Sequence, residues 1–248
     1  MALTLATQAP GEPEIFASVQ GEGPSTGMPV AFCRLSRCNL ACVWCDTAYT
    51  WHFTGDNRPH RDAATFERRE NQLALDETEV AERIAKLHQR RLVLTGGEPL
   101  LQGPALAKML GHLARLAPGL TTEIETNGTV MPPDALDARI AQYTISPKLA
   151  HSGNPVDLAL PPPMLEHWSA EERAAFKFVI AEPADLAEVK RLAEQHAIPP
   201  HRIWLMPEGT DSATLRRRMD WLVPLCLEHN YRLSDRLHIH LFGDTRGT

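Results

Sequence analysis

The stretch Cys38-Asn-Leu-Ala-Cys42-Val-Trp-Cys45 carries three cysteines and follows Val30–Leu35, an apolar run that predicts a strand. Three thiolates at this spacing in one loop predict a metal or cluster site. A cubane iron–sulfur cluster has four irons, each normally held by a thiolate, so three cysteines leave one iron for a ligand outside the protein. An open metal position is typical of catalysis, whereas structural sites are closed.

The chain has five cysteines, and the two outside this loop, Cys33 and Cys226, are expected to be small buried apolar residues. An odd number without a secretory signal in Met1–Pro10 argues against a disulfide framework and favours the cytoplasm. A structural zinc site remains an alternative, because Cys33 or His52 could supply a fourth ligand.

The composition is that of a globular chain, with 248 residues, 43% hydrophobic and 23% charged. We expect a single domain, residues 1–248. No apolar run approaches the roughly 20 residues that cross a bilayer, so no membrane association is expected. The formal net charge of −6 gives no reason to expect nucleic-acid binding. Arg216–Arg218 is interpreted as a solvated helix face, with a phosphate site as the alternative.

Short apolar runs alternate with helical patterns along the rest of the chain. The alternation predicts an α/β fold with a mostly parallel sheet, and the chain is short for a complete eight-fold barrel, so an incomplete, open barrel is expected. Two segments look irregular: Thr50–Gln72, a polar excursion, and Asn154–Trp168, a proline-rich loop. Further strands are predicted at Leu92–Leu94, Thr121–Glu125, Tyr143–Ser146, Phe176–Ile180, Ile203–Met206 and Leu237–Leu241, and helices around Val80–Leu87 (N-cap Asp76 or Thr78), Leu106–Leu113 and Leu186–Leu192.

Polar motifs close three successive predicted strands: Thr95-Gly-Gly-Glu-Pro99, Glu125-Thr-Asn-Gly128 and Ser146-Pro-Lys148. A barrel-like fold places its ligand at the carboxyl ends of its strands, which favours a ligand site there. Glycines permit close approach of backbone and ligand, and the carboxylate of Glu98 suits an ammonium group. Ordinary turn chemistry is the alternative for each motif taken singly. Upstream, Gln20-Gly-Glu-Gly23 is either a surface loop or a loop that holds a polar heterocycle.

The cysteine loop, with Trp44 before its last cysteine, resembles that of the radical S-adenosylmethionine (SAM) superfamily. The whole set of motifs resembles the 7-carboxy-7-deazaguanine synthase family. The segments that carry this resemblance are Gln20–Gly23, Phe32–Arg34, Cys38–Thr47, Thr95–Pro99, Glu125–Thr129 and Ser146–Lys148.

The resemblance implies a modified, incomplete radical SAM barrel and a reaction in queuosine biosynthesis. In that reaction 6-carboxy-5,6,7,8-tetrahydropterin becomes 7-carboxy-7-deazaguanine with loss of ammonia, a carbon–nitrogen lyase activity. It further implies a [4Fe-4S] cluster, SAM, Mg2+, an electron donor such as flavodoxin or ferredoxin, and a homodimer. The alternative is a radical SAM activase that makes a glycyl radical on a protein partner, with the same cysteine loop and a peptide substrate.

The resemblance also assigns roles to residues. The cluster would be held by Cys38, Cys42 and Cys45, and Mg2+ by Thr47. SAM would contact Trp44, Cys45, Asp46, Gly97, Glu98, Thr126, Asn127, Ser146, Pro147 and Lys148. The pterin would contact Val19, Gln20, Gly21, Glu22, Arg34, Thr95 and His240, with the guanidinium of Arg34 as the partner of the substrate carboxylate.

The C-terminal segment gives a weaker pattern. On the predicted strand Leu237–Leu241, His238 and His240 alternate with apolar residues and would share one face. We expect that His240 faces the substrate, with two solvent-facing histidines as the alternative. In the family the chain terminus can reach the substrate site, so contacts from Thr248 or His238 are left open.

Overall fold

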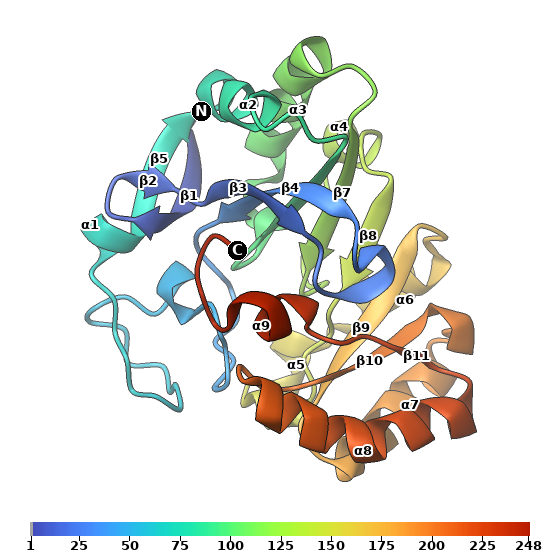
Figure 1. Cartoon of the computed structure of the whole chain (residues 1–248). Coiled ribbons are helices and arrows are strands. Elements are labelled where there is room, and N and C mark those ends of the chain that lie inside the picture. Colours follow the sequence, from blue (N-terminus) through green and yellow to red (C-terminus); the bar gives the residue numbers. More distant parts are fainter. Residues whose placement is uncertain (1) are drawn as a thin grey trace.

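The computed structural model describes residues 2–248, and the strands of this part of the chain form one open sheet of eleven strands (Figure 1). The strands are β1 (Ala2–Ala9), β2 (Glu12–Pro13), β3 (Ile15–Val19), β4 (Pro29–Leu35), β5 (Gln72–Asp76), β6 (Arg91–Gly96), β7 (Thr121–Thr126), β8 (Gln142–Ile145), β9 (Ala174–Ile180), β10 (Ile203–Pro207) and β11 (Arg232–Leu233). Their order is β11-β10-β9-β8-β7-β6-β4-β1-β2, with β3 paired to β4 and β5 to β1.

From β4 to β11 this path is parallel throughout, and the antiparallel strands lie at its N-terminal edge. The predicted α/β class and the open, mostly parallel sheet are therefore confirmed, because β11 and β2 stay at opposite edges and do not close a barrel. The parallel arrangement brings the carboxyl ends of successive strands to one edge of the sheet.

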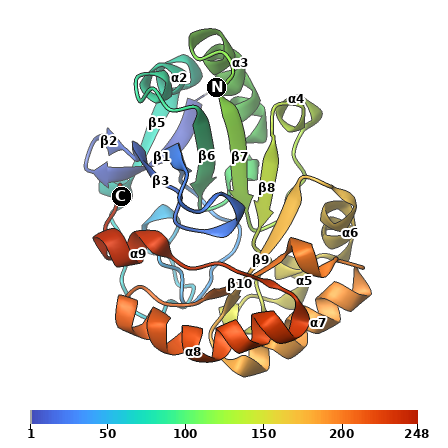
Figure 2. The ribbon, with the colours of Figure 1, turned by 45° about the vertical axis from the view of Figure 1, so that its right-hand side comes forward.

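Helices cover the outside of the curved sheet, and one lies across its opening (Figure 2). The helices are α1 (Arg68–Asn71), α2 (Glu77–Ala85), α3 (Gly103–Leu116), α4 (Asp134–Asp137), α5 (Val156–Ala159), α6 (Pro162–Ala170), α7 (Leu186–Gln195), α8 (Ser212–His229) and α9 (Leu237–Phe242). In both views α9 crosses the open side of the sheet, near the N-terminal strands. In the described part of the chain, no helix has the length and apolar character needed to cross a membrane.

Side chains of alternating strand residues pack on opposite faces of the sheet. Leu92 and Leu94 of β6 belong to the large core beneath the outer helices, whereas Val93 packs with Phe16, Val30 and Phe32 in a small cluster on the inner face. This alternation follows from the two-residue period of a strand. The inner face therefore has few apolar residues and is left for polar side chains.

The predicted helices form where their apolar faces can be buried. At the start of α2 the side chain of Asp76 accepts a hydrogen bond from the backbone N–H of Thr78 at 2.8 Å, which confirms Asp76 as the N-cap. Val80 and Ile84, one turn apart on α2, are fully buried.

Two sequence predictions are wrong. Asn154–Trp168 is not a loop, since it contains α5 and most of α6, and α6 begins with Pro162, a residue preorganised for the first helical position. Leu237–Leu241 is not a strand but part of α9, in which only Ile239 is fully buried. The other six predicted strands correspond to β4 and β6 to β10.

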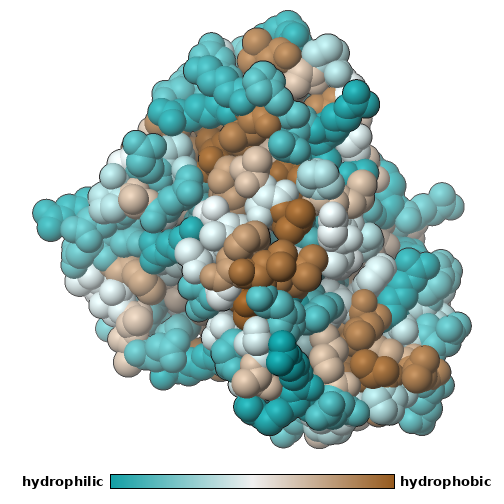
Figure 3. Space-filling model, viewed as in Figure 1, coloured by the Kyte–Doolittle hydropathy of each residue, from teal (hydrophilic) through white to brown (hydrophobic). Residues whose placement is uncertain are grey.

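Figure 3 shows an apolar area in the middle of the face that carries α9. Leu241 and Phe242 at the end of this helix are among the exposed large hydrophobic residues, with 54% and 45% of their surfaces accessible.

Candidate active site

A cavity of about 450 Å³ opens at the carboxyl ends of the parallel strands, a size within the range of small-molecule sites. Its walls come from the cysteine loop, the Gln20–Gly23 loop, the Thr50–Gln72 excursion and the C-terminal segment. Most of the predicted site residues line it: Val19, Gln20, Gly21, Glu22, Arg34, Cys38, Cys42, Trp44, Cys45, Asp46, Thr47, Thr95, Gly97, Thr126, Asn127, Ser146 and Lys148.

The three loop cysteines lie in this one cavity as unpaired thiols. Burial raises the pKa of Cys38 to about 12 and that of Cys42 to about 11, and burial also raises the pKa of Cys45. The thiols are therefore protonated until a cation displaces the protons, and binding of iron would release them.

The arrangement fits a cluster better than a zinc ion. Cys33 is in the core and His52 hydrogen-bonds the carbonyl of Ala64 through Nδ1 at 2.6 Å, so neither lines the cavity as a fourth ligand. Within residues 2–248, no three His, Cys, Asp or Glu side chains gather closely enough to hold a single ion. Each thiolate of a cubane binds a different iron, so its cysteines need not converge on one point.

The glycines after β6 allow the strand and the cysteine loop to lie in contact. Gly96 has φ +135°, and a side chain there would overlap the backbone of Leu35. A side chain at Gly97 would overlap the carbonyl of Arg37, just before the first cluster cysteine. Both positions need glycine because two stretches of backbone approach each other closely.

Glu98 differs from its predicted role. Its carboxylate is fully buried, does not line the cavity, and accepts hydrogen bonds from Leu100 N (2.9 Å), Thr126 Oγ1 (2.8 Å) and Asn127 N (2.8 Å). Glu98 thus fixes two turns beneath the cavity, and these hydrogen bonds hold its side chain away from the cavity in which SAM is predicted to bind. Pro147 does not line the cavity either, although its neighbours Ser146 and Lys148 do.

Trp44 forms part of the cavity wall beside Lys148. Its ring stacks on His151 with centroids 5.5 Å apart, and the Lys148 ammonium is 5.6 Å from its centroid. Among the described residues the buried indole N–H of Trp44 has no hydrogen-bond partner. A ligand that accepts this hydrogen bond would satisfy a donor that is otherwise costly to bury.

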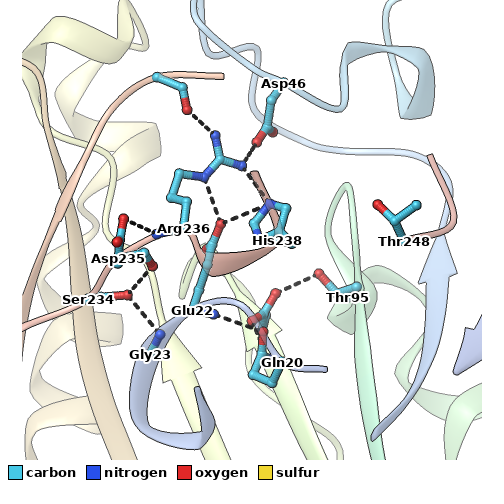
Figure 4. A network of polar contacts seen from close by, with 12 residues as sticks. Gln20, Glu22, Gly23, Asp46, Thr95, Ser234, Asp235, Arg236, His238 and Thr248 are labelled. Atoms are coloured by element: carbon cyan, nitrogen blue, oxygen red, sulfur yellow. Dashed lines mark hydrogen bonds and ion pairs between the residues drawn. The ribbon is translucent and has the colours of Figure 1, made fainter. Parts of the chain in front are cut away.

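A network of charged side chains surrounds Glu22 in the cavity wall (Figure 4). Glu22 forms ion pairs with Lys177 of β9 and with Arg236, whose Nε is 2.9 Å from Glu22 Oε1. Arg236 also binds Asp46 of the cysteine loop and donates to the carbonyl of Gly209 at 2.6 Å. One guanidinium thus joins the Gln20–Gly23 loop to the cysteine loop.

The same network sets the ionisation of these groups. Burial alone would raise the pKa of Glu22, but Lys177, Arg236 and His238 hold it well below its usual value. Burial also opposes ionisation of Asp46, and Arg236 lowers its pKa. For His238, burial outweighs the nearby carboxylates and lowers the pKa. At neutral pH Glu22 and Asp46 are therefore ionised, and the imidazole of His238 is neutral.

Two further carboxylates, Glu125 and Glu14, hold polar side chains of the wall toward the strand ends. The Gln20 amide donates to Glu125 Oε1 at 3.1 Å, and Thr95 Oγ1 donates to Glu125 Oε2 at 2.9 Å. Arg34 lines the cavity while its Nε binds Glu14 at 2.7 Å, a fully buried carboxylate that also accepts from Tyr49. Glu14 fixes the direction of the Arg34 guanidinium.

The C-terminal segment reaches the cavity, but not through His240. His238 and Thr248 line it, whereas His240 contacts Ser212 Oγ at 2.9 Å and Asp235 Oδ1 at 3.2 Å outside it. The structure does not bring His240 to the cavity, because Leu237–Leu241 is helical and successive even positions of a helix, unlike those of a strand, point to different sides. Sequence reasoning also missed Lys177 and Arg236, which belong to no motif. The only feature that could have indicated them is that each is a charged residue within or next to an apolar run.

Comparison with known proteins agrees with the fold and the site. A model of the Radical SAM superfamily matches residues 34–144. The crystal structure of QueE from Escherichia coli superposes with a TM-score of 0.64 at 25% identity, covering 96% of this chain and 95% of that one. Streptococcus suis SuiB bound to its precursor peptide shares the fold alone, with a TM-score of 0.53 and 14% identity over 83% of this chain and 47% of its own. The open parallel sheet and the three-cysteine loop thus define a radical SAM enzyme.

Curated relatives narrow the class. The 7-carboxy-7-deazaguanine synthase of Pyrobaculum aerophilum is 32% identical over 94% of this chain and 95% of its own length. The 7-carboxy-7-deazaguanine synthase of Hyperthermus butylicus is 34% identical over 91% of this chain and 90% of its own length. The chain belongs to the 7-carboxy-7-deazaguanine synthase family.

Proposed function

We propose that this enzyme converts 6-carboxy-5,6,7,8-tetrahydropterin to 7-carboxy-7-deazaguanine, with loss of ammonia, in the biosynthesis of queuosine and related 7-deazapurines. One observation carries the proposal: the cysteine loop and the Gln20–Gly23 loop face the same cavity and are joined by Arg236. Relatives that bear the synthase name align over more than nine-tenths of the chain.

Cys38, Cys42 and Cys45 would hold the cluster at three irons. When bound, the cluster supplies the electron that splits SAM and so generates the radical that abstracts hydrogen from the substrate. The groups placed for SAM are the backbone of Gly97, the side chains of Asn127, Ser146 and Lys148, and Trp44 with its unpartnered N–H among the described residues. The walls of the cavity around these groups would limit the access of water to a reactive intermediate.

Anionic and cationic side chains lie in different parts of the cavity wall that is proposed to bind the pterin. Glu22, kept ionised by Lys177 and Arg236, would accept N–H groups of the heterocycle, since charge-assisted hydrogen bonds are stronger than neutral ones. Arg34, on the other side of Thr95, would bind the substrate carboxylate. The pterin would therefore be oriented by an anionic group at one end and a cationic group at the other.

Further components of the proposal are Mg2+, a reductant and a second subunit. The hydroxyl of Thr47 lines the cavity next to Asp46, and oxygen donors suit Mg2+, which usually keeps several waters. We expect flavodoxin or ferredoxin as the electron donor and a homodimer as the assembly. The relatives described above bear the synthase name, so nothing among them favours the activase alternative.

An anaerobic assay of the reconstituted protein with SAM, reductant and the carboxypterin tests the proposal. We expect 7-carboxy-7-deazaguanine and ammonia in equal amounts, and loss of product when the pterin is omitted. An activase would instead cleave SAM and transfer the radical to a glycine of a partner protein without the pterin. SAM cleavage that does not respond to the pterin would contradict the proposed function.

A further inference from the structure

Each of the three cluster cysteines faces one side-chain N–H donor, and the donors come from three separate segments. Trp51 Nε1 lies 3.4 Å from Cys45 Sγ, and Asn154 Nδ2 lies 3.3 Å from Cys42 Sγ. Asn127 Nδ2 lies 3.9 Å from Cys38 Sγ, the longest of the three contacts. Cys45 Sγ also contacts Thr47 Oγ1 at 3.6 Å, and the amide nitrogens of Asn127 and Asn154 donate in addition to Asn39 Oδ1 and Ser152 Oγ. Every sulfur therefore has a partial positive charge beside it.

The donors are held in these orientations by other hydrogen bonds. The Oδ1 atom of Asn154 accepts from the backbone N–H of Ala41 at 2.8 Å, so its amide nitrogen must point to Cys42. The Oδ1 atom of Asn127 accepts from the N–H of Thr129 at 2.9 Å, which directs its nitrogen to the side of Cys38. Trp51 has only a donor, and it is 4% exposed.

Trp51 is the second residue of the Thr50–Gln72 excursion, a segment to which the proposed reaction assigns no role. Residues of the excursion form hydrogen bonds with the loop that ends at Cys45. His60 Nε2 contacts the carbonyl of Cys45 at 2.8 Å, and Arg61 N donates to the carbonyl of Val43 at 2.8 Å. A bridge between Phe53 and Phe66 closes the excursion on itself. The Arg58 guanidinium covers the outer face of the Trp51 ring at 4.6 Å. The excursion therefore fixes the indole against the sulfur.

Hydrogen bonds to cluster sulfurs are one of the main controls of an iron–sulfur reduction potential. They stabilise the reduced cluster more than the oxidised one, because reduction places more negative charge on the sulfurs, and so they raise the potential. We propose that Trp51, Asn154 and Asn127 are positioning residues that set the reduction potential of the cluster, and that the excursion serves to hold Trp51. This inference rests on the proposed function, since it requires the cluster.

The test is a redox titration, followed by electron paramagnetic resonance, of the reconstituted full-length protein. Trp51→Phe keeps the aromatic ring and removes the N–H, so the midpoint potential is expected to shift to a more negative value. Trp204→Phe is the matched control, because Trp204 lies on β10 under Arg232 and does not line the cavity; its potential should equal that of the unsubstituted protein.

A second variant keeps the test decisive if Trp51→Phe retains little cluster. Asn154→Asp preserves the acceptor for Ala41 and replaces the N–H donor with a carboxyl oxygen, so it should shift the potential further negative. An unchanged potential in both variants would overturn the inference, and so would a positive shift, which would mean that the side chains act by excluding water. Failure of the unsubstituted protein to take up four irons per chain would instead refute the proposed function.

Discussion

Arg236 shows how one side chain can join segments that are distant in the chain. Its guanidinium contacts Glu22, Asp46 and the carbonyl of Gly209, and its side chain is only 8% exposed. A buried guanidinium is tolerated when its donors are matched by carboxylates in good geometry. Removing it would leave Asp46 without its main counter-charge and Glu22 with Lys177 alone.

We therefore predict that Arg236→Gln destabilises the fold by about 3–5 kcal/mol, as expected when one partner of a buried ion pair is lost. The variant should also bind the carboxypterin more weakly, because Glu22 loses its orientation. Urea unfolding and equilibrium binding would measure the two effects. Arg216→Gln, at an exposed position of α8, is the control and should change neither. Equal stability of the two variants would contradict the role given to Arg236.

The ionisation of the network predicts how stability depends on pH. The pKa values of Glu22 and Asp46 are lower in the folded state than their usual values of 4.5 and 3.8. Their contribution is therefore complete above about pH 5 and is lost as the pH falls through the usual carboxyl range and below. Unfolding free energies between pH 7 and pH 3 should fall less steeply for Glu22→Gln than for the unsubstituted protein. Parallel curves would contradict the assignment.

At the level of elements, the sequence predicts what depends on local pattern. The apolar runs Val30–Leu35 and Phe176–Ile180 become β4 and β9, since a strand buried on both faces needs only a continuous apolar segment. Leu237–Leu241 has the period of a strand but becomes α9, because the strand before it, β11, is a short edge strand and α9 packs against the Gln20–Gly23 loop instead. Tertiary contact overrides the pattern there.

The site divides in the same way. The three cysteines and the polar strand ends were predictable because their spacing carries the chemistry. Three features were not predictable: the roles of Lys177 and Arg236, and the contact of Trp51 with Cys45. The first two depend on ion-pair partners that are distant in the sequence, and the third depends on the orientation of the indole ring. The buried position of the Glu98 side chain was not predictable either, because a motif identifies a residue but does not show which way its side chain points.

The absence of a side chain at Gly21 allows α9 to pack against the Gln20–Gly23 loop, so a methyl group at this position is expected to change the stability of the fold. A Cβ at Gly21 would overlap the ring of His238, while Leu237 N donates to the Gly21 carbonyl at 2.9 Å. Gly21→Ala should destabilise the fold by roughly 1–3 kcal/mol, as overpacking does, and weaken pterin binding. At Gly111, inside α3, an added Cβ would meet only the Arg139 guanidinium at an ordinary contact distance of 3.9 Å, so Gly111→Ala should instead stabilise by about 0.5–1 kcal/mol. Thermal unfolding compares the two, and a neutral Gly21→Ala would contradict the docking role.

For the molecule as a whole, the open sheet explains why so many distant segments can share one cavity. Parallel strands deliver Thr95, Thr126 and Ser146 to one edge, and the C-terminal segment closes over them with His238 and Thr248. A closed barrel would leave less room for the cysteine loop and the excursion on the same side. The architecture therefore supplies both the wall that carries the three loop cysteines and the wall that is proposed to bind the pterin.

Among the five cysteines, only the three of the loop should be needed to retain the cluster. We predict that Cys42→Ala lowers the iron and sulfide content and abolishes turnover. Cys226→Ala, which removes a buried thiol of α8 outside the cavity, should retain the full cluster. Iron and sulfide analysis after anaerobic reconstitution measures both, and a full cluster in Cys42→Ala would contradict the ligand assignment.

The account depends most on an iron that the protein leaves open for SAM. The direct measurement is electron paramagnetic resonance of the reduced, reconstituted protein before and after addition of SAM. We predict four irons per chain and a clear change in the spectrum when SAM binds. A spectrum that SAM does not alter, in a protein that holds its four irons, would show that the polypeptide caps every iron and would contradict the account.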